Sequence, residues 1–201
     1  MRKLIGAAFV SLDGVMQAPG GPEEDPSDGF DLGGWVYPFW DDTIEGGMAP
    51  LFSGPLDLLL GRRTYDMWAG HWPDRNDDPI GEAYNRAAKY VVTSRTGALS
   101  WSNSHALNDG FDGVARIKEQ DGPDLQVWGS STLYRGLIGR GLLDRLFLIT
   151  FPVILGRGKR LFAGDMPART LTLVDSQTSK TGVIIATYEP AGPVQTGSFA
   201  A

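Results

Sequence analysis

Short apolar runs recur along the chain, and most of the early ones are separated by a stretch long enough for one helix. Runs of about four to eight apolar residues bounded by turn residues indicate buried strands. Strands that alternate with helices build a largely parallel sheet, because a parallel pair needs a crossover connection. The predicted strands span residues 3–10, 56–60, 90–93, 125–128, 146–155, 170–175 and 182–188.

Helical stretches are predicted at 38–48, after Arg62, around 82–88, at 111–119 and at 131–138. The last three predicted strands have no helix between them, so we expect them to pair antiparallel. The fold class that follows is α/β, with a mixed sheet that is mostly parallel, has an antiparallel C-terminal edge and is flanked by helices.

One domain is expected over residues 1–190, because 201 residues with 42% hydrophobic content can bury a single full core. Residues 191–201 are expected to form a flexible C-terminal tail. Between Gln17 and Gly34 the composition shifts to Gly, Pro, Asp and Glu, which predicts a long loop. Such a loop is often a lid over a site, although a surface insertion explains the composition too. The sequence leaves open whether it covers a ligand or wraps a partner subunit.

Composition excludes several kinds of site. The chain has no cysteine and only two histidines, so thiolate chemistry and a Cys/His metal centre lack their groups, and no metal is expected. A net charge of −6 argues against a nucleic-acid partner. The apolar run at the N-terminus is too short to cross a membrane, so we expect no membrane partner and take the cytoplasm as the default compartment.

Three predicted strands end in segments suited to phosphate groups. A helix N-terminus attracts phosphate through its unpaired amides, arginine adds bidentate hydrogen bonds, and glycine lets the backbone approach closely. Taken alone, the first two segments are better explained by an ordinary turn with exposed arginines, and a plain strand-to-helix capping turn is the alternative for the third. Because the carboxyl ends of parallel strands share one sheet edge, the three together predict one anion-binding site. The segments are Gly61-Arg62-Arg63-Thr64, Thr93-Ser94-Arg95 and Trp128-Gly129-Ser130-Ser131-Thr132-Leu133.

Further motifs connect these segments to a known family. They are Ser11-Leu12-Asp13-Gly14, Leu60-Gly61-Arg62-Arg63-Thr64-Tyr65, and the blocks at 127–133, 141–144 and 151–162. In their order and spacing, the chain resembles the dihydrofolate-reductase-like superfamily. The resemblance covers nearly the whole chain and is strongest to stand-alone relatives of the C-terminal reductase domain of bifunctional riboflavin-biosynthesis deaminase-reductases.

The resemblance implies a mixed sheet of about eight strands, NADPH as the cofactor, a small-molecule substrate and a homodimer. By the same resemblance, Arg62, Arg63 and Thr64 would approach cofactor phosphates, Ser94 and Arg95 would meet the adenosine 2′-phosphate, and residues 129–133 would meet the pyrophosphate. The remaining residues assigned to the cofactor site are Ala8, Gly14, Gly61, Thr93 and Trp128.

One position departs from the family pattern. Riboflavin reductase domains commonly carry a glutamate before the small-residue turn, and here that residue is Trp128. The expected function is therefore an NADPH-dependent reductase, similar to 5-amino-6-(5-phosphoribosylamino)uracil reductase, that transfers hydride to a pteridine- or pyrimidine-like molecule. Dihydrofolate reduction and a non-catalytic NADPH-binding module are the alternatives.

Asp13, Asp42 and Glu45 are the predicted catalytic residues. Asp42 and Glu45 lie on the predicted helix after several aromatic residues, which would raise a carboxyl pKa or stack on a planar ring. Acidic residues in a first helical turn also simply complement the helix dipole. Asp13 follows the first strand within a family motif, although stabilising the turn at Gly14 is an alternative role.

Overall fold

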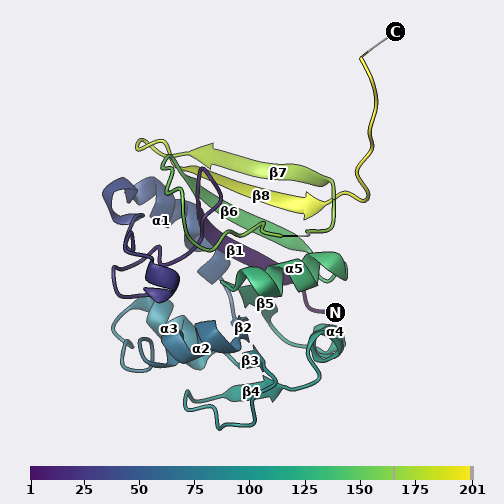
Figure 1. The fold of residues 1–201 in the computed structure, drawn as a ribbon. Helices are drawn as coiled ribbons and strands as arrows, with labels where there is room; N and C mark the ends of the chain where they lie inside the picture. The colour runs from purple at the N-terminus through teal and green to yellow at the C-terminus, as the bar shows by residue number, and fades with distance from the viewer. Residues whose placement is uncertain (165, 200–201) are drawn as a thin grey trace.

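The computed structural model describes residues 1–164 and 166–199. Within them, eight strands form one sheet in the order β4-β3-β2-β5-β1-β6-β8-β7, which runs from the bottom to the top of Figure 1. The pairs from β4 to β6 are parallel, whereas β8 and β7 run antiparallel at the far edge. The predicted fold class is confirmed. The strands are β1 Leu4–Ser11, β2 Leu56–Gly61, β3 Lys89–Val92, β4 Ser104–Leu107, β5 Asp124–Val127, β6 Arg145–Phe151, β7 Leu171–Thr178 and β8 Ile184–Pro190.

Helices pack on both faces of the sheet, because side chains of a strand alternate between the two faces. Leu59 of β2 packs into the same cluster as residues of α4 and α5, whereas its neighbours Leu58 and Leu60 pack with residues of α2 and α3. The helices are α1 Asp42–Met48, α2 Arg62–Ala69, α3 Pro79–Arg86, α4 Phe111–Glu119 and α5 Ser131–Gly139, with short 3-10 turns at Ser27–Gly29, Tyr37–Phe39 and Ala49–Phe52.

Three details differ from the sequence-based expectation. Strand β4 was not predicted, because Ser104 and His105 leave it without an apolar run and it is held by backbone pairing to β3. The helix expected over 38–48 begins only at Asp42, since the Asp41 carboxylate caps it by accepting hydrogen bonds from two helix amides. Strand β6 ends before Pro152, which has no N–H for the ladder.

Strands β1 and β5 pair over only three residues before they part. Leu4 to Gly6 lie opposite Leu125 to Val127, and the pairing stops there. The hydroxyl of Tyr134, from α5, fills the gap and lies 2.8 Å from the carbonyl oxygen of Ala7 and 2.6 Å from that of Val127. A side chain at Gly6 would collide with this ring, because its Cβ would lie 2.5 Å from Tyr134 Cε1. The gap therefore depends on a glycine and a tyrosine that face each other.

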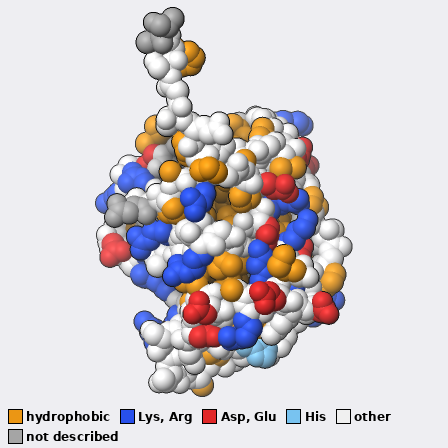
Figure 2. All heavy atoms as spheres, turned by 90° about the vertical axis from the view of Figure 1, so that its right-hand side faces the viewer, with side chains coloured by type: hydrophobic (Ala, Val, Ile, Leu, Met, Phe, Trp, Pro, Cys, Tyr) orange, Lys and Arg blue, Asp and Glu red, His pale blue; other side chains and the backbone are white. Residues whose placement is uncertain are grey.

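The C-terminal segment leaves the sheet after β8. Ala191 and Gly192 still pair with Thr170, and the last described residues extend away from the body of the protein (Figure 2). Residues 200–201 of the predicted tail lie outside the described residues, and the flexibility of the tail stays a prediction. The expected homodimer also stays a prediction; the edge strand β7 exposes about half of the Leu173 and Val174 side chains. No helix in residues 1–164 or 166–199 is long and apolar enough to cross a membrane.

Replacing Tyr134 by phenylalanine tests the parting of β1 and β5. The change leaves the carbonyls of Ala7 and Val127 buried without the hydroxyl, so we expect the free energy of unfolding to fall by about 1–3 kcal/mol. Urea denaturation measures the change. Tyr37→Phe is the matched control, because Tyr37 is 83% exposed, and it should leave stability unaltered. Equal stability of Tyr134→Phe and the wild type would contradict this role of the hydroxyl.

Candidate functional site

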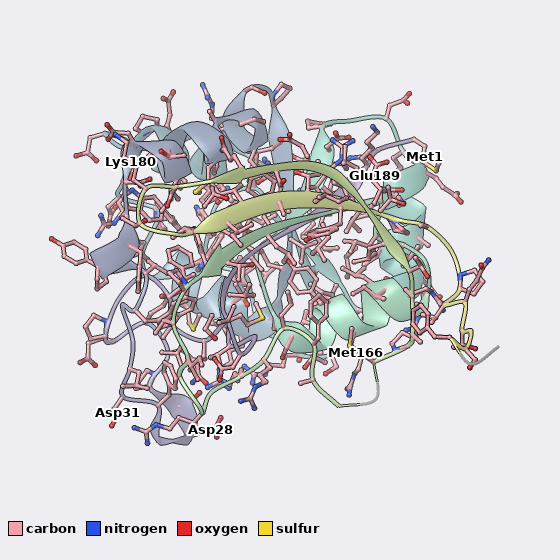
Figure 3. All side chains as sticks on the ribbon, turned by 90° about the horizontal axis from the view of Figure 1, so that it is seen from above. Met1, Asp28, Asp31, Met166, Lys180 and Glu189 are labelled. Atoms are coloured by element: carbon pink, nitrogen blue, oxygen red, sulfur yellow. The ribbon has the colours of Figure 1, made fainter. Side chains whose placement is uncertain are left out.

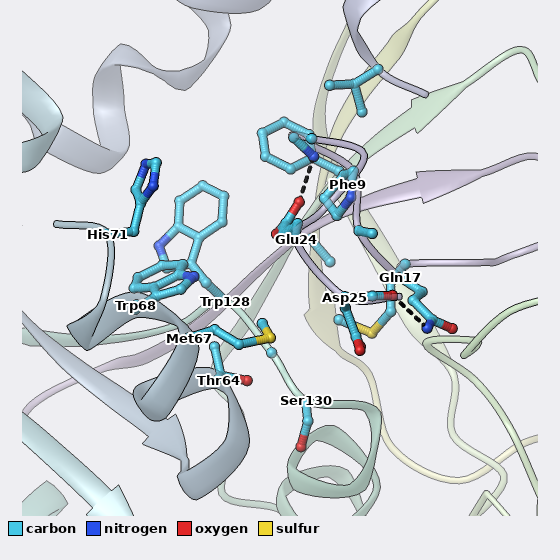
Figure 4. A pocket seen from close by; sticks show the side chains of 18 of the residues that line it. Phe9, Gln17, Glu24, Asp25, Thr64, Met67, Trp68, His71, Trp128 and Ser130 are labelled. Carbon is cyan, nitrogen blue, oxygen red and sulfur yellow. Dashed lines mark hydrogen bonds between the residues drawn. The ribbon is translucent and has the colours of Figure 1, made fainter. Parts of the chain in front are cut away.

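A cavity of about 850 Å³ opens where β1 and β5 part. Ala8 and Phe9 of β1, the turn that follows β5 and the first part of the 17–34 loop line it. Figure 4 shows Trp68 and Trp128 together on one side, with Gln17, Glu24 and Asp25 of the loop on the other. The loop therefore contributes directly to the wall of the cavity.

Aromatic rings make up much of the cavity wall. Trp128 packs against Phe9, with 5.8 Å between ring centroids, and stacks on Phe52 at 6.3 Å. Its indole N–H donates a 2.9 Å hydrogen bond to Gln126, which fixes the orientation of the ring. Trp68 stacks on Tyr84 at 5.0 Å on the same wall. Flat, apolar and rigid walls of this kind suit a planar ring system.

The turns after β2 and β5 lie against each other beside the cavity. A Cβ at Gly61 would lie 3.2 Å from the hydroxyl oxygen of Ser130, and one at Gly129 would lie 3.2 Å from that of Thr64. Neither α2 nor α5 has a side-chain cap at its N-terminus within the described residues. Two sets of helix amides thus point into one glycine-lined corner, an arrangement that can receive anionic groups.

The third predicted segment reaches this corner through Asp66. The Arg62 guanidinium donates to Asp66 at 2.8 Å, and Arg95 donates to the same carboxylate at 3.4 Å. Thr93 accepts a 3.0 Å hydrogen bond from the Arg95 amide. The Nη1 atom of Arg62 is buried and has no hydrogen-bond partner among the described residues. The structure thus brings the three segments together, and their cofactor role stays a prediction.

Of the other residues assigned to the cofactor site, some line the cavity and others do not. Ala8, Arg63 and Ser131 line it. Gly14 forms a turn after β1 with φ of +81°, and its carbonyl accepts a hydrogen bond from Leu161. The side chain of Leu133 is buried in the core. The residues of this set that do not line the cavity wall are Gly14, Gly61, Arg62, Thr93, Ser94, Arg95, Thr132 and Leu133.

Asp13 does not line the cavity. Its carboxylate accepts hydrogen bonds from the Ser11 hydroxyl at 2.6 Å and from the amides of Leu155 and Gly156 at 3.1 and 2.9 Å. These bonds, with the Ser11 hydroxyl first, hold the pKa of Asp13 well below its ordinary value against the opposing effect of burial. The geometry gives Asp13 the role of an anchor for the segment after β6.

Asp42 and Glu45 are also outside the cavity wall. Both are exposed in the first turn of α1, where acidic side chains complement the helix dipole. Glu45 accepts a 2.9 Å hydrogen bond from the indole N–H of Trp40, which does line the cavity. Glu45 therefore reaches the cavity wall through this one ring.

The sequence interpretation missed the acidic residues of the 17–34 loop. Glu24 and Asp25 line the cavity, whereas their Gly/Pro-rich surroundings indicated only a long loop. Gln17 organises the loop: its side chain donates to the carbonyl of Asp25 at 2.9 Å and accepts from the Lys159 amide, also at 2.9 Å. His71, set aside on sequence grounds, lies on the cavity wall too.

Asp25 fastens the loop to the rest of the protein. Its carboxylate accepts from Lys159 at 2.6 Å and from Arg63 of α2 at 3.3 Å. Burial alone would raise the pKa of Asp25, but hydrogen bonds from Lys159 and Ser27 and the nearby Arg63 charge outweigh it and lower the pKa. The carboxylate is therefore charged at neutral pH, and Arg63 and Lys159 are both engaged by the loop.

Comparisons with known proteins show which family and which fold the chain is similar to. The RibD C-terminal domain family matches residues 2–185. The uncharacterized protein YyaP of Bacillus subtilis (strain 168) is 28% identical over 198 residues, covering 93% of this chain and 94% of YyaP.

Two solved structures share the fold. A candidate riboflavin biosynthesis protein from Shewanella sp. PV-4 superposes with a TM-score of 0.67 at 16% identity, covering 94% of this chain and 99% of the other. Dihydrofolate reductase from Enterococcus faecalis, solved with NADP(H) and RAB-propyl, superposes with a TM-score of 0.58 at 15% identity, covering 94% and 96%. The fold is thus dihydrofolate-reductase-like.

Asp25→Asn tests how the loop is fastened. The neutral amide loses the charge-assisted bonds to Lys159 and Arg63, so we expect faster amide hydrogen exchange over residues 17–30 and unchanged exchange in β1. Because the pKa of Asp25 is lowered on folding, the wild-type loop should lose the same protection as the pH falls below the ordinary aspartate value of 3.8.

Asp28→Asn is the matched control on the same loop. Figure 3 shows Asp28 at the periphery of the molecule, and its carboxylate is 80% exposed and 4.0 Å from the Lys159 ammonium. Its exchange pattern should match the wild type. If Asp25→Asn and Asp28→Asn show the same amide hydrogen exchange over residues 17–30, the Asp25 carboxylate does not fasten the loop.

Proposed function

Since the chain belongs to the RibD C-terminal domain family, we propose that it is an NADPH-dependent reductase of a planar, pteridine- or pyrimidine-like heterocycle. The observation that carries the proposal is a glycine-lined corner, formed by the turns after β2 and β5 beside an aromatic cavity and linked to the segment after β3 through the contact of Arg95 with Asp66. In an open α/β sheet, ligands bind at the carboxyl ends of the strands, and here those ends provide anion-binding and ring-binding surfaces side by side.

The chemistry of the corner suits a dinucleotide cofactor. The uncapped amides of α2 and α5 would take the cofactor phosphates, and Gly61 and Gly129 let the two turns lie close together, since a Cβ at either would lie 3.2 Å from the hydroxyl oxygen of Ser130 or Thr64. Among the described residues, the buried Nη1 atom of Arg62 has no hydrogen-bond partner, and an anionic oxygen would supply one. Arg95, beside it at Asp66, would add a second charge for a 2′-phosphate and favour NADPH over NADH.

The cavity supplies the second half of the site. When bound, NADPH supplies a hydride; the residues of this chain hold and orient the acceptor ring. Trp128 and Phe9 offer flat surfaces for that ring, and the 17–25 segment of the loop, which lines the same cavity, would limit the access of water to it. Trp128 stands where riboflavin reductase relatives commonly carry a glutamate, so this side chain would bind the ring by stacking and contribute no charge.

Two other functions are compatible with the same site. Dihydrofolate, which also contains a planar pteridine, would use the same surfaces. A module that binds NADPH without turnover would keep the corner and leave the cavity without a reactive ligand.

Thermal-shift measurements test the cofactor. A ligand that binds only the folded state raises the melting temperature, and we expect a larger rise with NADPH than with NADH. Arg62→Ala should weaken NADPH binding about tenfold or more, because it removes charge-assisted hydrogen bonds, and Arg95→Ala should narrow the preference for NADPH. Arg86→Ala is the control, because Arg86 forms an exposed ion pair with Glu82 on α3, and the variant should bind NADPH as the wild type does. An equal response to NADPH and NADH would overturn the assignment of the 2′-phosphate site.

NADPH oxidation tests the substrate. We expect turnover with 5-amino-6-(5-phosphoribosylamino)uracil or with dihydrofolate. For the compound that is turned over, Trp128→Ala should raise KM about tenfold, because the variant loses the stacking surface. Tyr37→Ala removes an exposed ring away from the cavity and should change nothing. No oxidation with either compound would remove both named substrates, and tight NADPH binding without turnover of any heterocycle would favour the non-catalytic module.

A further inference from the structure

Among the residues that the structure describes, no positive charge on the cavity wall is left without a counter-charge. The Lys159 ammonium lies 2.6 Å from the Asp25 carboxylate, and the Arg63 guanidinium lies 3.3 Å from it. Desolvation and the nearby Arg75 charge lower the pKa of His71 from its ordinary value of 6.5, so this ring is uncharged at neutral pH. The charged or titratable side chains of the wall are Glu23, Glu24, Asp25, Arg63, His71 and Lys159. Three carboxyl groups thus face two cations.

The pair of Asp25 with Lys159 is the stronger of the two pairs. The Asp25 side chain is 11% exposed and that of Lys159 is 30% exposed, whereas that of Arg63 is 58% exposed. An exposed ion pair contributes little free energy, but separating a buried pair leaves a charge without solvent or partner. An anion that binds Lys159 must displace Asp25 and leave its carboxylate unpaired. Lys159 is therefore closed to anions while Asp25 holds it.

We propose that the cavity takes an uncharged planar heterocycle, and that Asp25 determines this specificity by holding the cations that an anionic ligand would use. The proposal rests on the reductase function above and adds to it the class of substrate, a ring that carries no phosphate or carboxylate. The two compounds named above as substrates are anionic. Analogues with the same rings and no negative charge should bind more tightly than either.

The donors that lack a partner lie beside the cavity, in the glycine-lined corner. The buried Nη1 atom of Arg62 has no hydrogen-bond partner in the described part of the chain, and α2 and α5 begin there without side-chain caps. An anion gains most in this corner, and an uncharged ring gains most against Phe9 and Trp128 in the cavity. The charges of the site thus separate a cofactor that carries phosphate groups from a substrate that carries none.

The test compares the binding of 6-hydroxymethylpterin and pterin-6-carboxylate, which share one fluorescent planar ring and differ in charge at neutral pH. Both dissociation constants are measured by fluorescence without any cofactor. We expect the wild type to bind the uncharged pterin about tenfold or more tightly than the carboxylate. Asp25→Asn releases Lys159 and Arg63 for charge-assisted hydrogen bonds, so it should shift the ratio of the two constants toward the carboxylate by about tenfold or more.

The ratio separates this role of Asp25 from a purely structural one, because a loop that is merely loosened changes the affinity for both pterins alike. Asp25→Glu keeps the carboxylate and should keep the wild-type ratio. Asp28→Asn is the matched control, since the Asp28 side chain is 80% exposed and lies outside the cavity wall, and it should keep the ratio too. Adding Lys159→Gln to Asp25→Asn removes the better-buried cation and should abolish most of the shift.

The proposal is overturned if the wild type binds the carboxylate as tightly as the uncharged pterin, or if it binds neither. It is also overturned if Asp25→Asn leaves the ratio unaltered, or if the full shift persists without Lys159. Selection by charge that depends on Asp25, together with no stabilisation by NADPH, would remove the reductase function and leave a cavity for uncharged rings. Stabilisation by NADPH with equal binding of the two pterins would keep the reductase function and remove the substrate class proposed for it.

Discussion

The separation of β1 from β5 is the constraint on which the site depends. Two parallel strands that part inside a sheet leave backbone carbonyls without ladder partners, and such buried groups are costly unless something bonds to them. The Tyr134 hydroxyl, fully buried between Ala7 and Val127, meets both. Gly6 leaves space for the tyrosine ring. One residue from α5 thus stabilises an opening in the sheet, and the cavity forms beyond it.

The same opening decides which residues face the ligand. Phe9 continues β1 and Trp128 continues β5, so the two rings meet across the gap at 5.8 Å. The turn that carries Trp128 also starts α5, which places helix amides and the ring wall within a few residues of each other. Because Tyr134 lies on that helix too, the stability of the core and the geometry of the site are coupled through α5.

Much of this arrangement could be predicted from the sequence, since it follows from rules for strand ends. The glycine-containing turns after residues 60 and 128 predicted a shared edge, and the structure brings Gly61 to Ser130 and Gly129 to Thr64. The loop residues could not be found in this way. Asp25 reaches the cavity through tertiary contacts with Gln17 and Lys159, which lie far apart in the sequence and have no periodic pattern, and it brings the adjacent Glu24 with it. Asp13 was expected at the site because of its place in a sequence motif. Its hydrogen bonds with the amides of residues 155 and 156, which the motif does not reveal, hold it outside the cavity wall.

The two bonds of Asp25 have a consequence for the choice of ligand. Arg63 and Lys159 are the arginine and lysine on the cavity wall, and both already hold this carboxylate. Asp25 therefore acts as a tethered competitor for any phosphate or carboxylate that enters, and tethering gives it an effective concentration of roughly millimolar. An anionic ligand gains these cations only by displacing the loop, whereas an uncharged ring leaves them in place. While the loop stays in this position, the aromatic rings are therefore the surfaces of the wall that a ligand meets without competing with Asp25.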